Sequence, residues 1–351
     1  MEDEKLERRA KETILNLFDS IPFVSLEELG IGGPSKIKLP DFVFGLKTEN
    51  KSRYLFVEVK SSGQPKPVRN AVNQLLRYME NFPDACGMIA APYMSSRAMA
   101  ICEEAGLGAV DFAGNALISC EPVFVRIEGN PNPFSKDRGL RSLYSPKASR
   151  ILRVLLNSST NHVWKVEELK EEADVSIGLV SNMKKLLDER EWIQSHEAGF
   201  SLADPEALLR EWSENYSFRK NRTVDFYTIK TLPEIEAAVS EAGNGSGRIA
   251  LTGFSAAARI APAVRYQRVS AYVESDIENT AKLLDLKKVD SGANVTLLEP
   301  YDEGVFYQNK EIDSVLCVSP VQAFLDLKGF RGRGEEAAEM LLERVIRKIW
   351  L

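Results

Sequence analysis

The chain is 351 residues long, carries a formal net charge of −6 and contains four cysteines and two histidines. This length predicts two or three domains, and the negative charge excludes a general polyanion binder, so contacts with DNA must come from local basic patches. The cysteines form no C-x-x-C pair, which argues against a structural zinc site and favours free buried thiols in a reducing cytoplasm. The N-terminus lacks a signal-peptide pattern and no apolar run approaches a membrane span, so we expect no membrane contact.

The first predicted unit covers residues 1–135, where alternating helices and strands indicate an α/β sandwich. A strand that carries Asp41 is followed by a polar turn and a second strand. In this second strand the side-chain period of two puts Glu58 and Lys60 on one face and apolar residues on the other. Two carboxylates and a lysine on one side of a hairpin suit a hydrolytic site for Mg²⁺ (or Mn²⁺), because hard cations take oxygen ligands. We therefore expect Asp41 and Glu58 to bind the metal and Lys60 to orient or deprotonate the attacking water.

The order of these residues carries a family resemblance. A proline precedes Asp41, Glu58 and Lys60 form a Glu-x-Lys triplet, and Gln74 follows on a predicted helix. This arrangement resembles the PD-(D/E)xK nuclease superfamily, which has the restriction-endonuclease-like fold. The resemblance implies that Gln74 lies near the metal or the phosphate and that Glu12, in the first helix, is a further catalytic candidate. The alternative is an ordinary solvated strand face, and intact motif residues do not by themselves establish activity.

A second motif in this unit is the turn "DFAGNA", which contains Asp111 and Asn115. Its Gly-Asn pair is typical of a tight turn at the end of a strand. The alternative is that Asp111 and Asn115 lie at the mouth of the predicted metal site.

A basic segment connects the first unit to the second. It is rich in proline, glycine, asparagine and serine and then becomes basic, with Arg138, Arg141, Lys147 and Arg150. Such a segment before a helix is either an arm that contacts DNA phosphates or a solvated linker between domains.

The middle unit, residues 145–212, has the order helix, helix, helix and two short strands, which predicts a winged helix-turn-helix. We expect its third helix to bury Ile177, Val180, Met183, Leu186 and Leu187. The outward positions are predicted to be Gly178, Ser181, Asn182, Lys184 and Lys185. Small, polar and basic residues on an outer face are typical of a helix that reads the major groove. The segment resembles the third helix of many bacterial winged-helix regulators, although winged helices also serve as protein-interaction modules.

The last unit, residues 213–351, is predicted to be an α/β module. Its segments "LTGFSAAARIAP", "VSPVQAFLDL" and "GRGEEAAEMLLE" resemble the C-terminal region of the AbiEi family, the antitoxin-repressors of type IV toxin–antitoxin systems in bacterial abortive infection. A Gly/Ser turn before a helix is also typical of nucleotidyltransferases, which carry acids on the next strand. Here Ser270 and Tyr272 occupy those positions. We therefore expect a non-catalytic relative of that fold or an unrelated α/β module.

Together these patterns predict a mixed α+β multidomain chain in the cytoplasm that binds double-stranded DNA. The favoured function is a transcriptional regulator of the antitoxin type that carries a nuclease-like domain, with a toxin as partner and a homodimer as assembly. The alternative is a Mg²⁺-dependent DNA endonuclease targeted by its winged helix. A third hypothesis is a scaffold in phage defence with an inert nuclease-like domain.

Overall fold

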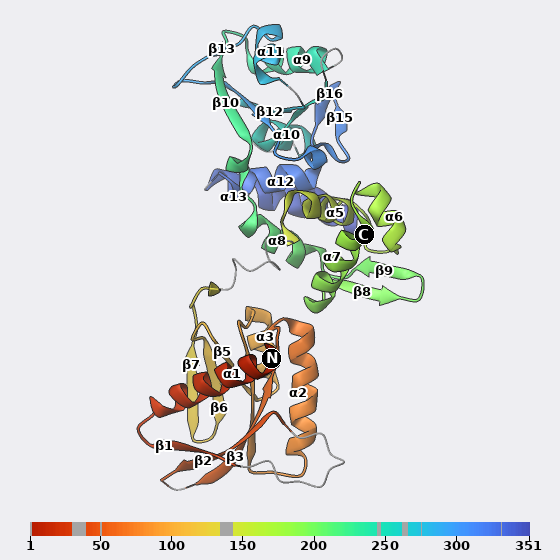
Figure 1. Cartoon of the computed structure of the whole chain (residues 1–351). Helices are drawn as coiled ribbons and strands as arrows, with labels where there is room; N and C mark the ends of the chain where they lie inside the picture. Colours follow the sequence, from red (N-terminus) through yellow and green to blue (C-terminus); the bar gives the residue numbers. More distant parts are fainter. Residues whose placement is uncertain are drawn as a thin grey trace. The chain divides into compact units, whose positions relative to one another are not determined.

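The computed structural model describes residues 2–29, 40–49, 51–133, 143–243, 247–261, 266–274, 276–330 and 332–351. The chain forms two compact units, Met1–Leu140 with Asp188–Glu191, and Arg141–Leu187 with Trp192–Leu351. The predicted mixed α+β class is confirmed, because each unit combines helices with a seven-stranded sheet (Figure 1). Over the described ranges, no helix is both long and apolar enough to cross a membrane.

The first unit is built on a sheet whose strands follow the order of the chain, β1 to β7. β3, β4 and β5 are parallel neighbours and the other neighbours are antiparallel. The edge strand β1 has alternating polar residues and was not indicated by the sequence pattern. The elements are α1 (Glu2–Asp19), β1 (Val24–Glu28), β2 (Phe42–Thr48), β3 (Ser52–Val59), α2 (Pro65–Met79), β4 (Ala85–Ala91), α3 (Ser96–Glu104), β5 (Gly108–Asp111), β6 (Ala116–Cys120) and β7 (Val123–Ile127).

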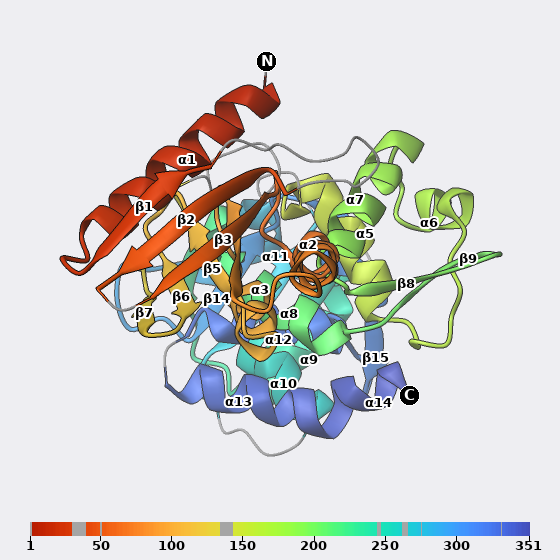
Figure 2. The same ribbon diagram turned by 90° about the horizontal axis from the view of Figure 1, so that it is seen from below.

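The two faces of this sheet have separate apolar cores. Leu55, Val57 and Val59 of β3 pack with α1 in one core. Phe56 points the other way and packs with α2 and α3 in the second core. Figure 2 shows α1 and α2 on opposite sides of β2 and β3. The predicted alternation of this strand is thus confirmed, and it places Glu58 on the face that α2 covers.

The cysteines depart from the expectation of four free thiols. Cys86 in β4 and Cys120 in β6 form a disulfide, with their Cα atoms 5.6 Å apart. They meet because β5, which lies between these two strands, is shorter than either and leaves their ends adjacent. Cys102 and Cys317 are free and buried, and burial raises the pKa of each thiol to about 12. The prediction of free thiols was therefore wrong for the first pair.

The second unit begins with the predicted winged-helix order of three helices and a two-stranded wing. Pro146 stands at the first turn of the first helix, where a missing N–H costs no hydrogen bond. Asp204 caps the helix that follows the wing, accepting a hydrogen bond from the Ala207 amide at 3.1 Å. The elements are α5 (Pro146–Leu156), α6 (Val166–Glu172), α7 (Ile177–Glu189), β8 (Ile193–His196), β9 (Gly199–Leu202) and α8 (Pro205–Asn215).

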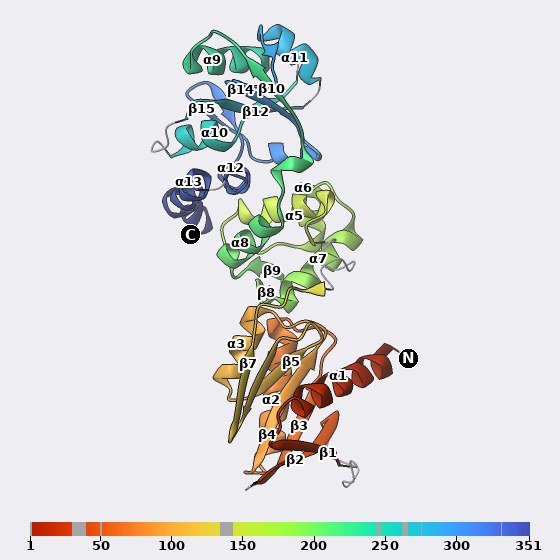
Figure 3. The same cartoon turned by 90° about the vertical axis from the view of Figure 1, so that its left-hand side faces the viewer.

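The rest of the second unit is built on a seven-stranded mixed sheet, with its strands in the order β13-β10-β14-β12-β11-β16-β15. Figure 3 shows α9 and α11 on one side of its strands and α10 and α12 on the other. The elements are η2 (Phe218–Lys220), β10 (Arg222–Tyr227), α9 (Leu232–Gly243), β11 (Ile249–Leu251), α10 (Gly253–Ile260), β12 (Val269–Val273), α11 (Ile277–Leu283), β13 (Lys287–Lys288), β14 (Val295–Glu299), η3 (Glu303–Phe306), β15 (Lys310–Ile312), β16 (Val315–Cys317), α12 (Pro320–Lys328), α13 (Arg333–Leu341), η4 (Leu342–Ile346) and α14 (Arg347–Trp350).

A buried polar network joins the winged helix to this sheet within the second unit. Arg153 of α5 and Asp326 of α12 are fully buried, and Gln322 lies between them. The Gln322 Oε1 accepts from Arg153 at 2.7 and 3.0 Å, and its Nε2 donates to Asp326 Oδ1 at 3.0 Å. Tyr216, Tyr272 and Thr252 also donate to the Asp326 carboxyl group. The predicted units 145–212 and 213–351 therefore share one compact body.

Glu339 provides a test of the packing of the C-terminal helices. Its carboxylate accepts hydrogen bonds from Arg210 of α8 at 2.9 and 3.0 Å and from Lys328 of α12 at 2.8 Å. The hydrogen bonds from Arg210 are the main cause that lowers the pKa of Glu339 to about 2. Because the pKa in the unfolded chain is about 4.3, this carboxylate stabilises the fold above that pH. Its contribution is lost as the pH falls through about 2.

We expect Glu339→Gln to lower the free energy of unfolding at pH 7 and to weaken its fall between pH 5 and pH 2. Urea unfolding at several pH values measures both quantities. Glu335→Gln is the control, because Glu335 is exposed on the same helix. If the free energy of unfolding of Glu339→Gln fell with pH as steeply as that of the wild type, the stabilising role of the Glu339 carboxylate would be contradicted.

Candidate metal site and candidate nucleic-acid interface

Asp41 and the Glu-x-Lys triplet meet where β2 begins and β3 ends. The two strands are antiparallel and pair Phe42 with Val57, so Asp41 lies beside the end of β3. The Asp41 Oδ2 accepts a hydrogen bond from the backbone amide of Val59 at 2.7 Å. This bond fixes the aspartate carboxylate next to Glu58 and Lys60.

The side chain of Glu58 is the centre of this cluster and is only 2% exposed. Its Oε2 accepts from Lys60 Nζ at 2.6 Å, and its Oε1 accepts from Gln74 Nε2 at 2.8 Å. Gln74 comes from α2 and also donates to the Tyr78 hydroxyl at 2.6 Å. Burial raises the pKa of Tyr78, and the charges of Glu58 and Asp41 raise it further, so both carboxylates act on this hydroxyl.

The donor chemistry of the cluster fits a magnesium ion. Mg²⁺ is typically held by one or two carboxylates and keeps several water or phosphate ligands. The carboxylate groups of Asp41 and Glu58, which lie beside each other, are oxygen ligands of this kind. Glu12 is not brought to this cluster: its side chain is exposed on α1, 4.0 Å from Arg8, and α1 covers the opposite face of the sheet. The four other predicted residues, Asp41, Glu58, Lys60 and Gln74, come together.

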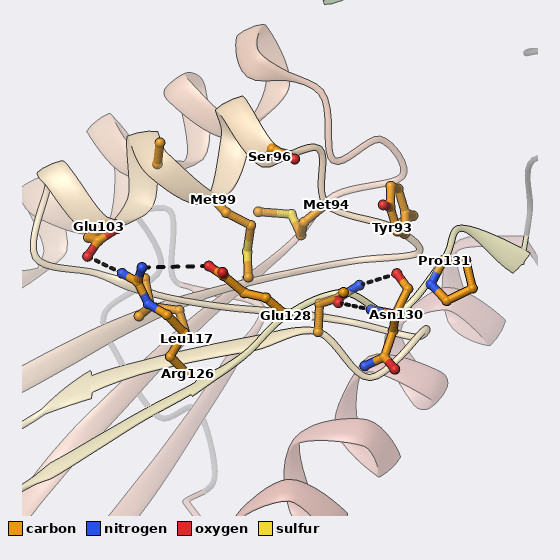
Figure 4. Close-up of a pocket in the computed structure, with 13 residues that line it drawn as sticks. Tyr93, Met94, Ser96, Met99, Glu103, Leu117, Arg126, Glu128, Asn130 and Pro131 are labelled. Atoms are coloured by element: carbon orange, nitrogen blue, oxygen red, sulfur yellow. Dashed lines mark hydrogen bonds and ion pairs between the residues drawn. The ribbon is translucent and has the colours of Figure 1, made fainter. Parts of the chain in front are cut away.

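The Asp111 turn belongs to a different part of the same unit. The buried Asp111 carboxylate accepts four hydrogen bonds, from the amides of Met94, Ala113 and Asn115 and from the Asn115 side chain, at 2.8–3.1 Å. Asn115 also lines a cavity of about 500 Å³ that includes Met94 and residues of α3, β6 and β7 (Figure 4). None of Asp41, Glu58, Lys60 and Gln74 lines that cavity. These contacts support the turn-forming role of Asp111.

The α7 helix presents most of its predicted outer face to solvent. Gly178, Ser181, Asn182 and Lys185 are exposed, and Ser176 caps the helix through a bond from the Leu179 amide at 3.3 Å. These side chains form a surface, hereafter the α7 face, that offers one amide, one hydroxyl and one ammonium group. They carry the polar groups that hydrogen-bond base edges and phosphates.

Three details of this helix differ from prediction. Lys184 is half-buried, and its Nζ lies 5.3 Å from the centre of the Phe200 ring of the wing. Ile177 is 49% exposed rather than buried, because packing against the winged-helix core begins at Val180. Leu186 is partly buried. The aromatic partner of Lys184 lies on another element, so the spacing of residues along α7 does not predict this contact.

The predicted basic arm is only partly described. Arg138 and Arg141 lie outside the described residues, and Lys147 is exposed on α5. Arg150 is held within the protein, where its Nε donates to Asp302 at 2.9 and 3.0 Å and its NH1 to Asp174 at 3.0 Å. The bond with Asp302 raises the pKa of Arg150. Arg150 is therefore engaged by carboxylates rather than available to phosphates.

Residues 201–347 match the protein family described as "Transcriptional regulator, AbiEi antitoxin, Type IV TA system". No curated protein and no solved structure matches the chain. All three segments that carried the AbiEi resemblance lie within the matched residues, so the region from β9 to η4 of this chain is similar to that regulator family.

Proposed function

We propose that this chain is a DNA-binding transcriptional regulator of the antitoxin type. The match of residues 201–347 to a transcriptional regulator family carries the proposal. The exposed α7 face supports it, because a winged helix beside a regulator module offers a way to reach DNA. A toxin is the protein partner that the antitoxin description suggests, and the second unit is the part of the chain that we propose to bind it.

The regulator proposal is tested by selecting bound sequences from a pool of random DNA duplexes with the full chain. We expect the selected duplexes to share one motif. Two half-sites about one helical turn apart would indicate a homodimer. Enrichment of no motif over repeated rounds would contradict sequence-specific regulation by this chain.

The convergence of Asp41, Glu58, Lys60 and Gln74 favours a second candidate function, a metal-dependent DNA endonuclease. Asp41 and Glu58 would hold Mg²⁺, which when bound would lower the pKa of a water and offset charge on a phosphate. Lys60 contacts Glu58 and is more exposed than it, at 24% against 2% of the side chain, and would position that water. Gln74 holds the Glu58 carboxylate in place from α2.

We expect Asp41→Asn and Lys60→Ala each to abolish cleavage of plasmid DNA in the presence of Mg²⁺ or Mn²⁺ while the fold is retained. The aspartate substitution removes a metal ligand, and the lysine substitution removes the group beside the water. Asp19→Asn serves as control, because Asp19 is exposed at the end of α1. Circular dichroism checks the fold. Cleavage at the wild-type rate by either variant would refute the endonuclease proposal. If the wild-type protein binds DNA without cutting it, only the regulator proposal remains.

A further inference from the structure

The second unit contains a cavity of about 500 Å³ that the functions above do not use. It opens on the face of the sheet that α10 and α12 cover in part. Its size lies within the range of about 300–1,000 Å³ that is typical of small-molecule sites. Its lining divides into a polar floor, an aromatic wall and a cationic rim.

The floor is a row of polar side chains across three strands. Asp225 of β10 pairs in register with Thr296 of β14, which pairs with Ser270 of β12. Residues paired in this way point to the same face of a sheet. The Thr296 hydroxyl donates to Asp225 Oδ1 at 2.6 Å, which orients a carboxylate that is still 42% exposed. The floor therefore offers hydrogen-bond acceptors to hydroxyl or amino groups of a ligand.

The wall consists of three phenylalanines from separate segments. Phe330 is central, with its ring centre 5.5 Å from that of Phe218 and 5.5 Å from that of Phe254. The Phe330 side chain is 37% exposed, so part of its ring surface is open to the cavity and to solvent. An exposed aromatic ring binds planar rings well, and the stacking of a base on such a ring strengthens binding roughly five- to 150-fold.

The buried network holds this wall in place. Tyr216, Thr252 and Asp326 precede Phe218, Phe254 and Phe330 by two, two and four residues. Both Tyr216 and Thr252 donate to the Asp326 carboxyl group, at 2.6 and 2.5 Å. The three segments that carry the wall are thus tied together beneath it, and a preformed site loses less entropy on binding.

The rim carries two guanidinium groups. Arg268 lines the cavity and donates to Asp225 and Thr296 at 3.4–3.5 Å, and its side chain is 47% exposed. Arg333, at the first position of α13, also lines the cavity. Arginine binds phosphate oxygens with two parallel hydrogen bonds, so the rim suits a phosphate.

We propose that this cavity binds a mononucleotide. Its base stacks on Phe330 and its neighbours, its sugar hydroxyls donate to Asp225, and its phosphate meets Arg268 and Arg333. The floor accepts hydrogen bonds, the wall stacks on planar rings and the rim binds an anion. A nucleoside phosphate carries the three matching groups: sugar hydroxyls, a base and a phosphate. The site is separate from the α7 face and from the Glu58 cluster, so it adds a small-molecule ligand to the proposed regulator.

Isothermal titration of the full chain with AMP and GMP tests the proposal. We expect saturable binding, weakened about tenfold by Asp225→Asn, because the charged carboxylate acceptor becomes a neutral amide oxygen that accepts weaker hydrogen bonds. Phe330→Leu should weaken it about tenfold, since it keeps apolar volume but removes the ring. Asp290→Asn is the matched control, because Asp290 is exposed and lies outside the cavity.

Adenosine and ribose 5-phosphate complete the titration. Each should bind more weakly than AMP, because each lacks one of the groups that the wall or the rim contacts. Circular dichroism confirms that each variant is folded. Absence of saturable binding of both AMP and GMP at millimolar concentration would overturn the proposal. So would wild-type affinity in both Asp225→Asn and Phe330→Leu. Both outcomes are independent of DNA binding.

Discussion

Replacing Gln322 with alanine should lower the free energy of unfolding of the chain by about 1–3 kcal/mol or more, the cost of leaving buried polar and charged groups without a hydrogen-bond partner. Arg153 is fully buried, and Gln322 Oε1 is the acceptor of its Nε and NH2 groups. The Trp212 ring lies 5.2 Å from the guanidinium and contributes further to its stabilisation. Without Gln322, a buried cation loses an acceptor and Asp326 loses a donor.

Urea unfolding of the full chain measures this effect. Gln194→Ala is the matched control, because Gln194 is exposed on the wing strand β8 and should change stability little. A loss below about 1 kcal/mol for Gln322→Ala would contradict the role of Gln322 as the bridge between Arg153 and Asp326. The substitution should also weaken DNA binding at temperatures where the variant is partly unfolded.

Replacing Asn182 with alanine should weaken binding to the selected duplex by about 1–3 kcal/mol, which is the usual cost of a lost base contact. Asn182 is exposed at the middle of the α7 face and offers both a donor and an acceptor to a base edge. Fluorescence anisotropy with the selected duplex and with a shuffled duplex measures the loss. Specific binding should fall more than binding to the shuffled sequence.

The control for this substitution is Asn279→Ala, because Asn279 is exposed on α11 and far along the chain from the winged helix. Lys185→Ala gives a contrasting pattern. A lysine that contacts phosphate should weaken binding to both duplexes alike. If Asn182→Ala bound both duplexes as tightly as the wild type, α7 would serve a protein contact instead.

Local patterns in the sequence predicted local structure well. The alternation around Glu58 correctly assigned the two faces of β3, and the order of three helices and two short strands in residues 145–212 is the order that the sequence predicts. Asp41, Glu58, Lys60 and Gln74 lie together because they come from adjacent strands and the next helix, whereas their roles stay predictions.

The features that the sequence does not predict depend on partners far away in the chain. Arg150 pairs with Asp302, 152 residues later, and no local pattern identifies that carboxylate. Cys86 and Cys120 pair because an intervening strand is short, which spacing alone does not show. The Asp225 row likewise depends on the register of three strands. Such long-range geometry is set by the packing of the whole unit.

The most direct test of the regulator account is the affinity of the wild-type chain for its selected duplex as a function of salt concentration. We expect tight, sequence-preferring binding. The logarithm of the association constant should fall linearly with the logarithm of salt concentration, because contacts from Lys185 and its neighbours displace counterions from phosphates. Because the chain has a net charge of −6, such a slope must arise from a local basic surface. Binding that is indifferent to both sequence and salt, or no binding at low salt, would contradict the account.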